Sequence, residues 1–309
     1  MNILYADYNK VSDAAFAVLG KQLEGLKLDL PAFGEQINVL STECIDVLLK
    51  VYDFDVIMVG DIFWPTGQNI CDWSKRNNKV CCFLQHGQWI YIDNKKNPQH
   101  VPSCTFLFGG HVYDMVQTWP YAKRSRVEVV GNPRYDNLTI TESEDFLYFA
   151  PPVILEQIEG TKDRLNEVAR QSIVEYKNLD KEINLMIHPH YREGGIDILK
   201  GMFPNAQFID VHDDPLPYVL RCKSVLTHRN STTVLDAIAC HKLSVIMDKP
   251  SFYKKGYFGP FAYEALNMKD VILGFDKEVE VYNYEEEAYP YICLGNASER
   301  IRNVVQSGF

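Results

Sequence analysis

SVLTHRNSTTVLDAIACHKLSVIMD, residues 224–248, contains a complete strand, helix and strand in sequence. The runs 224–228 and 243–248 are short, apolar and rich in β-branched residues, as buried strands are. Between them, 232–240 carries apolar residues at helical spacing behind hydroxyl side chains that are able to cap a helix. This order predicts a unit of a parallel sheet with a crossover helix.

The same alternation extends through the second half of the chain. A polar stretch, TITESED at 139–145, precedes a new apolar run that starts at 146. The predicted helices and strands that follow it are helices at 161–179, 195–203 and 215–222, and strands at 183–190 and 206–211.

The first half repeats the pattern with five short β-rich runs, each of which contains or ends in Gly, Asn, Pro or His. They lie at 1–9, 54–63, 79–87, 103–111 and 126–133, and a helix is predicted at 12–26. We therefore predict an α/β fold with two domains, 1–140 and 141–309, each built on a parallel sheet covered by helices. The final helix, 296–306, is able to pack back on the first domain.

The composition excludes several classes of protein. The chain has 309 residues, 46% hydrophobic and 23% charged, which is enough to bury a large core. Its net charge of −10 repels a phosphate backbone, so nucleic acid is not expected as a partner. No apolar run approaches the ~18 residues of a membrane span and no leader is recognisable, so we expect a cytosolic protein. The eight cysteines lack CxxC spacing, so we expect no metal or other cofactor.

Polar residues directly follow three of the predicted strands. They are Gln85, His86 and Gly87; His188, Pro189 and His190; and the run 228–233. The carboxyl ends of parallel strands meet at one edge of a sheet, where ligands bind in open α/β folds. The three groups are therefore the candidate sites.

The run 228–233 is suited to an anion. Ser231 or Thr232 is able to cap the following helix, whose free N–H groups favour a phosphate, and Asn230 adds an amide beside them. Asp236 lies about one turn further, a distance suited to ribose hydroxyls. The alternative is an ordinary helix cap, with Asp236 on a solvated face.

The two histidines of 188–190 suggest a second contact with phosphate. Pro189 disfavours helical geometry at His188, so the imidazole is presented at the strand tip, where it is able to neutralise a leaving pyrophosphate. The alternative is a histidine that only closes the strand. A metal site is disfavoured because neither a carboxylate nor a third histidine has helpful spacing to His188 and His190.

In the first half, His86 is the candidate general base, since imidazole chemistry suits proton transfer near neutral pH. Gln85, Arg134 and Asp136 are candidates for the acceptor side of a cleft, and Arg134 is equally able to pair with a neighbouring carboxylate. His111 has no chemical partner in the sequence and is interpreted as structural. The chain contains no G-x-S-x-G, Walker A or G-x-G-x-x-G motif.

Taken in order, these motifs resemble a series found in GT-B-type bacterial enzymes that build surface carbohydrates. The resemblance covers roughly residues 80 to 250 and rests on LQHGQ, FGGHVYDMV, VVGNPRYDNL, LMIHPH and LTHRNSTTVLDAIACHKLSVI. Such enzymes include capsule and lipopolysaccharide glycosyltransferases, for example Kdo transferases, and CDP-glycerol glycerophosphotransferases of the teichoic-acid type. UDP-N-acetylglucosamine 2-epimerases share the fold.

The resemblance implies a GT-B-like fold, in which two Rossmann-like domains face each other across a cleft and the second holds the nucleotide donor. It implies that His188 and the cap formed by Ser231 and Thr232 hold the donor phosphates, and that Asp236 contacts the ribose. It also implies that His86 acts as a base towards the acceptor hydroxyl.

Two departures from the family pattern bear on substrate choice. The loop ADYNKVSD, 6–13, lacks the glycines that many GT-B enzymes have there, which weakens any statement on acceptor geometry. Asp236 stands where many relatives carry Glu, which leaves the donor open.

We therefore predict a nucleotide-sugar-dependent glycosyltransferase of bacterial surface polysaccharide synthesis, for which a CMP-sugar such as CMP-Kdo is a candidate donor. His86 or a cleft carboxylate assists the acceptor, a saccharide or lipid-linked saccharide. The expected place is the cytoplasm, including the inner face of the plasma membrane through partners. The alternatives are a glycerophosphotransferase, an epimerase and a non-catalytic sugar-nucleotide-binding protein.

Overall fold

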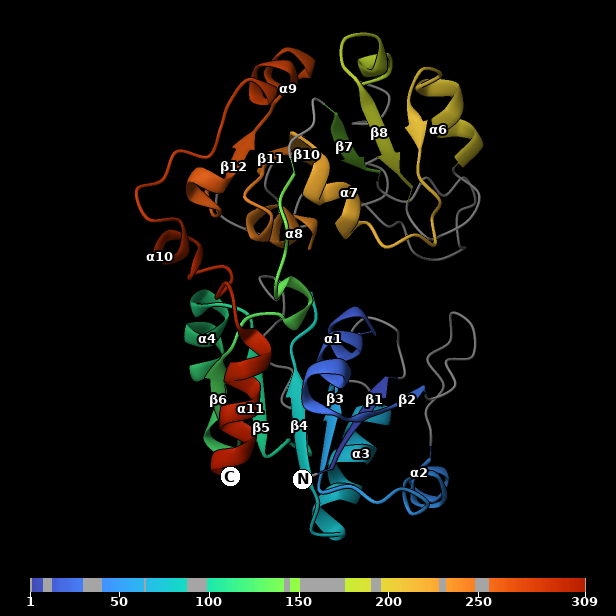
Figure 1. The fold of residues 1–309 in the computed structure, drawn as a ribbon, viewed down its shortest axis with the longest axis vertical. Coiled ribbons are helices and arrows are strands. Elements are labelled where there is room, and N and C mark those ends of the chain that lie inside the picture. The colour runs from blue at the N-terminus through green and yellow to red at the C-terminus, as the bar shows by residue number, and fades with distance from the viewer. Residues whose placement is uncertain are drawn as a thin grey trace. The chain divides into compact units, whose positions relative to one another are not determined.

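The computed structural model describes residues 2–7, 13–29, 41–63, 65–87, 99–141, 145–150, 176–189, 196–227, 232–247 and 256–308. It divides into two compact units, one of 1–137 with 283–309 and the other of 138–282 (Figure 1). The predicted second domain, 141–309, thus differs from the second unit at its carboxyl end. Residues 283–309 belong instead to the first unit. For the final helix, packing back on the first domain was one of the expected arrangements.

The first unit is built on a six-stranded sheet in which every pairing is parallel. Its strand order is β2-β1-β3-β4-β5-β6. The strands are β1 (Ile3–Asp7), β2 (Leu26–Asp29), β3 (Val56–Val59), β4 (Val80–Leu84), β5 (Cys104–Leu107) and β6 (Arg126–Val129). β3 and β5 are buried along their whole length, as continuous apolar runs require when helices cover both faces of a sheet.

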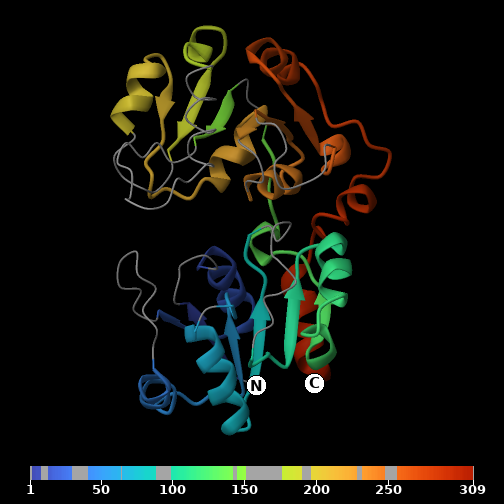
Figure 2. The same cartoon turned by 180° about the vertical axis from the view of Figure 1, so that it is seen from behind.

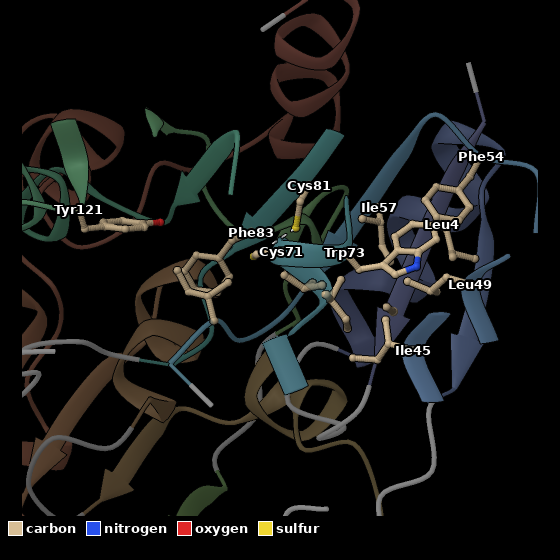
Figure 3. Packing of buried hydrophobic residues seen from close by; sticks show 14 of the residues in the cluster. Leu4, Ile45, Leu49, Phe54, Ile57, Cys71, Trp73, Cys81, Phe83 and Tyr121 are labelled. Carbon is tan, nitrogen blue, oxygen red and sulfur yellow. Dashed lines mark hydrogen bonds between the residues drawn. The ribbon is translucent and has the colours of Figure 1, made fainter. Parts of the chain in front are cut away.

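Successive strand residues point to opposite faces of this sheet. Ile57 and Val59 of β3 belong to a core shared with α2 (Thr42–Leu49), α3 (Pro65–Arg76) and α4 (Gly110–Gln117). Figure 3 shows this core, in which Trp73 packs beside Phe54. The other face is covered by α1 (Asp13–Leu23) and α11 (Ala297–Ser307), as Figures 1 and 2 show from opposite sides.

The carboxyl-terminal segment is fixed to the first unit by charged side chains and backbone contacts. It holds the short α10 (Tyr284–Ala288) and then α11. The Arg302 guanidinium donates to the Gln22 carbonyl at the end of α1, 2.7 Å away. The Arg300 Nε donates to the Val130 carbonyl at 2.8 Å, so α11 is tied to α1 and to the end of β6.

The second unit also has a six-stranded parallel sheet, in the order β12-β11-β10-β7-β8-β9. The strands are β7 (Phe146–Phe149), β8 (Leu185–His188), β9 (Gln207–Phe208), β10 (Ser224–Thr227), β11 (Leu243–Ile246) and β12 (Ala262–Glu264). The helices are α6 (Ile196–Met202), α7 (Leu216–Arg221), α8 (Thr233–Ala239) and α9 (Met268–Phe275). The strand, helix and strand predicted from 224–248 are confirmed as β10, α8 and β11, while most of the helix predicted at 161–179 lies outside the described residues.

Single turns of 3-10 helix complete the connections; they are η1 (Ala122–Arg124), η2 (Pro133–Tyr135), η3 (Leu179–Lys181) and η4 (Gly259–Phe261). Within the described part of the chain, no helix is both long and apolar enough to cross a membrane.

Candidate functional site

Each sheet has one place where the strand order reverses. In the first unit the chain builds β2 on one side of β1 and then β3 on the other; in the second, β8 and β10 flank β7 in the same way. Loops leave such a point in opposite directions, and ligands of open α/β sheets bind in the crevice at the carboxyl ends of the strands there. The ends of β1 and β3, and of β7 and β10, are therefore where a site is expected.

His86 lies at the first of these two points. It follows β4, but its imidazole reaches back over the end of β3, where Nδ1 lies 2.5 Å from the Gly60 carbonyl oxygen. Its Nε2 lies 3.5 Å from Oδ2 of Asp61. The His86 side chain is 24% exposed and the Asp61 side chain 3% exposed, so a ligand reaches the imidazole more readily than the carboxylate.

The Gly60 carbonyl fixes the protonation pattern of the ring. A carbonyl oxygen only accepts hydrogen bonds, so Nδ1 carries a hydrogen and donates it. In the neutral ring, Nε2 is then the nitrogen with a free lone pair, which is the form a general base needs. When Nε2 takes up a proton, the Asp61 carboxylate lies within ion-pair distance of the new charge.

Sequence reasoning missed Asp61, because the run FDVIMVGDIF at 54–63 was assigned to a strand as a whole. The strand ends at Val59, and Asp61 is buried in the loop after it with Oδ1 accepting from the Phe63 amide at 2.7 Å. A signal was present in the sequence: Gly60 and Asp61 interrupt the apolar run, as residues that follow the end of a strand do.

Gln85 shapes the loop that carries His86. The residue is only 1% exposed, so its amide is not accessible to an acceptor substrate. Its Oε1 accepts from the Phe108 amide at 2.8 Å, beyond the end of β5, and its Nε2 donates to the Gly87 carbonyl at 2.9 Å. Gly87 has a φ of +61°, a left-handed conformation that glycine adopts without strain. Gln85 thus belongs to the site as a support for the His86 loop.

Arg134 and Asp136 follow β6, near η2. Asp136 has a role that the sequence did not reveal: its two carboxylate oxygens accept from the backbone amides of Ala297 and Ser298, each at 2.8 Å. It therefore caps α11 from a distant part of the chain, and we leave it out of the proposed site. Arg134 is half-buried in η2, and its assignment to an acceptor stays a prediction.

In the second unit, His188 ends β8 and is half-buried. Its Nε2 lies 3.2 Å from the Asp213 carbonyl oxygen, and its ring lies beside that of Phe149 at the end of β7, with 5.6 Å between ring centroids. Because the carbonyl accepts a hydrogen from Nε2, His188 is able to donate from Nδ1 to a phosphate only as the doubly protonated ring.

The helix start after β10 differs in part from the expectation. Thr232 is the N-cap residue of α8, but among the described residues its hydroxyl makes no capping hydrogen bond. The Thr233 hydroxyl donates to that of Thr227 at 3.2 Å. Asp236 is 3% exposed, so the alternative that placed it on a solvated face is wrong. His190, Asn230 and Ser231 lie outside the described residues, and their roles stay predictions.

The cysteines are free thiols, and most are buried. Burial raises the pKa of Cys104 and of Cys222 each to about 12. The thiol sulfurs of Cys71 and Cys81 lie 3.5 Å apart within the core of the first unit (Figure 3). Among the described residues, no three His, Cys, Asp or Glu side chains gather as metal ligands do.

His111, predicted to be structural, begins α4 beside the carboxyl-terminal segment. Its backbone N–H donates to the Pro290 carbonyl at 2.8 Å, and its ring packs edge-on against Tyr291, with 5.1 Å between ring centroids. These contacts hold the segment against the first unit.

Comparison with known proteins places the chain by fold. No family model matches the sequence, and no curated protein matches it significantly. Among solved structures, UDP-GlcNAc 2-epimerase of Methanocaldococcus jannaschii is similar with a TM-score of 0.59 and 12% identity, over 99% of both chains. MurG of Acinetobacter baumannii has a TM-score of 0.56 and 10% identity, over 99% of both chains. A variant of the wall teichoic acid polymerase TagF has a TM-score of 0.61 and 10% identity, over 99% of this chain and 88% of the other.

These likenesses confirm the predicted fold class. The chain has a GT-B-like α/β fold with two parallel sheets, and its structural neighbours include the classes of enzyme that the motifs resemble. At 10 to 12% identity the comparisons show the fold and leave the activity to be argued from the site.

Proposed function

We propose that this chain is a glycosyltransferase that moves a sugar from a nucleotide-activated donor to a saccharide or lipid-linked saccharide. The pathway proposed is synthesis of a bacterial surface polysaccharide, such as capsule or lipopolysaccharide, and a CMP-sugar such as CMP-Kdo is a candidate donor. The proposed place is the cytoplasm, at the inner face of the plasma membrane when the acceptor is lipid-linked.

The observation that carries this proposal is the arrangement of His86 at the strand-order reversal of the first unit. A partly exposed imidazole whose Nδ1 is held by a carbonyl offers Nε2 to an incoming hydroxyl. In the proposed reaction the acceptor oxygen attacks the anomeric carbon, and its proton passes to His86 Nε2. The bond between that carbon and the donor phosphate breaks, and the nucleotide leaves with the bonding electrons.

The second unit is the proposed donor side. His188 at the end of β8, as the doubly protonated ring, would offset the negative charge that develops on the departing nucleotide. His190, Asn230, Ser231 and Thr232 are proposed as donor contacts, and Asp236 as the contact with the ribose. On the acceptor side we retain Arg134, and no metal is included, so treatment with EDTA is expected to leave turnover unchanged.

Two other enzyme classes are favoured by particular neighbours. TagF is named a wall teichoic acid polymerase, which supports the alternative of a CDP-glycerol glycerophosphotransferase. The Methanocaldococcus protein is named a UDP-GlcNAc 2-epimerase, which supports an isomerase. Product analysis separates the three classes. A glycosyltransferase forms a glycosidic bond, and a glycerophosphotransferase transfers phosphoglycerol from CDP-glycerol. An epimerase converts the nucleotide sugar without any acceptor.

The first experiment is a thermal-shift screen with CMP, CDP, UDP and GDP, because a ligand that binds only the folded state raises apparent stability. A nucleotide that stabilises the chain then identifies the donors for a transfer assay. Stabilisation without turnover of any donor would instead support a sugar-nucleotide-binding protein.

The assay then compares variants of the two histidines. His86→Gln should lower kcat by about 10²-fold to 10⁴-fold with donor affinity unchanged, as loss of a general base does. His188→Gln should weaken donor binding or turnover. His100→Gln is the matched control, since His100 is also a partly exposed histidine of the first unit beside a carboxylate. Wild-type transfer by His86→Gln would remove the proposed base.

A further inference from the structure

We infer that Asp61 is the positioning residue for His86: from beside Nε2 it stabilises the positive charge that the ring, held on the Gly60 carbonyl, acquires when it takes the acceptor proton. This inference deepens the proposed function and rests on it. It is carried by three contacts that converge on two consecutive residues, Gly60 and Asp61, directly after β3.

The first step concerns the geometry of the ring. His86 Nδ1 is fixed on the Gly60 carbonyl at 2.5 Å, while Nε2 lies 3.5 Å from Asp61 Oδ2. Because both partners belong to adjacent residues of one loop, a shift of that loop moves both contacts together. The end of β3 therefore determines where Nε2 points.

The second step concerns the carboxylate itself. Asp61 Oδ1 accepts from the Phe63 amide at 2.7 Å, which leaves Oδ2 directed at the ring. The Asp61 side chain is 3% exposed, and a buried carboxylate is costly unless it is paired. Because the carboxylate is buried, solvent screens this pair less than it screens a pair of surface charges.

The third step concerns the two protonation states. With hydrogen on Nδ1 alone, the ring is neutral and Nε2 accepts a proton. With hydrogen on both nitrogens, the ring is positively charged, its Nδ1 still donates to the Gly60 carbonyl, and Asp61 Oδ2 lies 3.5 Å from Nε2, within ion-pair distance. Asp61 thus favours the product of proton transfer and has no direct part in the bonds that change, since it acts through His86.

The first test needs no activity. In protein labelled with ¹⁵N-histidine, NMR of the ring nitrogens reports which nitrogen carries hydrogen, and the signals of His86 among the eight histidines are those lost in His86→Gln. We expect the neutral ring to carry its hydrogen on Nδ1, and Asp61→Asn to change the His86 signals. A neutral wild-type ring with hydrogen on Nε2, or His86 signals unmoved in Asp61→Asn, would overturn the inference.

The second test is a double-mutant cycle on transfer. Asp61→Asn should lower kcat by about 10-fold to 100-fold with KM for the donor unchanged, a smaller loss than that of the base itself. In the His86→Gln background, Asp61→Asn should cause no further loss, because a positioning residue acts only through its partner. Multiplying effects, or an unchanged kcat in Asp61→Asn, would show that this role is wrong.

A matched control is available in the same unit. Asp72 lies 3.5 Å from His100, the same separation as in the proposed pair, but its side chain is 29% exposed and it also pairs with Arg76. Asp72→Asn should leave kcat and the His86 signals unchanged. If His86→Gln transfers at the wild-type rate, the proposed function of His86 fails, while the NMR result still decides whether Asp61 acts on the ring.

Discussion

At the scale of single residues, Gln85 shows how a side chain without access to ligand supports the site. It joins the loops after β4 and β5 through two hydrogen bonds, so it sets the position from which His86 reaches β3. Gln85→Leu fills similar space but leaves the Phe108 amide and the Gly87 carbonyl without this partner. A buried group that loses its partner costs about 1 to 3 kcal/mol, so the free energy of unfolding in urea should fall by that amount.

The control for this prediction is Gln117→Leu, at the exposed end of α4. A surface change away from any special feature should alter stability by less than about 0.5 kcal/mol. Equal stability of the two variants would mean that the Gln85 hydrogen bonds contribute nothing to the loop.

The thiols give a second prediction at this scale. Cys44 lies exposed on α2, whereas Cys104 and Cys222 are buried with a pKa raised to about 12, so almost none of either is thiolate at pH 7.5. Brief treatment of the native protein with N-ethylmaleimide should modify Cys44 first, as peptide mass spectrometry would show. Cys44→Ser should remove this fast reaction. Modification of Cys104 or Cys222 at the rate of Cys44 would contradict the burial.

At the scale of elements, the loop after β6 depends on a glycine for two separate reasons. Gly131 has a φ of +83°, and a Cβ added there would lie 2.0 Å from the Cys293 carbonyl oxygen. Gly295 also has a positive φ, +62°, but no atom of the described residues lies within 4 Å of an added Cβ. The pair therefore separates the cost of backbone strain from the cost of the collision.

Gly131→Ala should destabilise the protein by more than Gly295→Ala, which carries only the strain of about 1 kcal/mol. We expect a difference of at least about 2 kcal/mol in the free energy of unfolding, because the chain at 293 must move away from β6. Similar losses of unfolding free energy in the two variants would show that the chain around Cys293 moves away from the added Cβ at no cost in stability.

The same elements show how far sequence reasoning reaches. Most strands of both sheets are predictable, since runs such as VCCFL are apolar throughout and end in polar or turn residues. The edge strands β2 and β12 were not predicted, because these short segments lack such a run. The cap on α11 is not, because Asp136 and Ala297 are 161 residues apart and no local pattern connects them. For the site, the imidazole of His86 was found from its place after a strand. The carboxylate beside it was missed because the whole run 54–63 was assigned to one strand, although Gly60 and Asp61 interrupt its apolar residues.

At the scale of the whole molecule, the chain forms one unit from two separate segments and the other from the residues between them. Each unit has its own hydrophobic core and its own parallel sheet. Units of this kind are able to unfold separately, so a single melting temperature need not describe the chain.

Calorimetry of the full chain is therefore expected to resolve two transitions. Asp136→Ala removes both acceptors from the start of α11, where Asn296 makes no side-chain cap among the described residues, and costs about 1 to 2 kcal/mol. It should lower the melting temperature of one transition by about 2 to 6 °C and so identify the first unit.

A nucleotide that binds the second unit should raise the other transition. At a concentration of about 100 times Kd, binding adds about 2.7 kcal/mol to the unit that holds the ligand, and this shift should persist in Asp136→Ala because the change lies in the other unit. If the nucleotide instead raises the transition that Asp136→Ala lowers, the donor belongs to the first unit. The roles proposed for His188 and Asp236 would then be wrong. The nucleotide would become, beside the acceptor, a second candidate ligand for the site of His86 and Asp61.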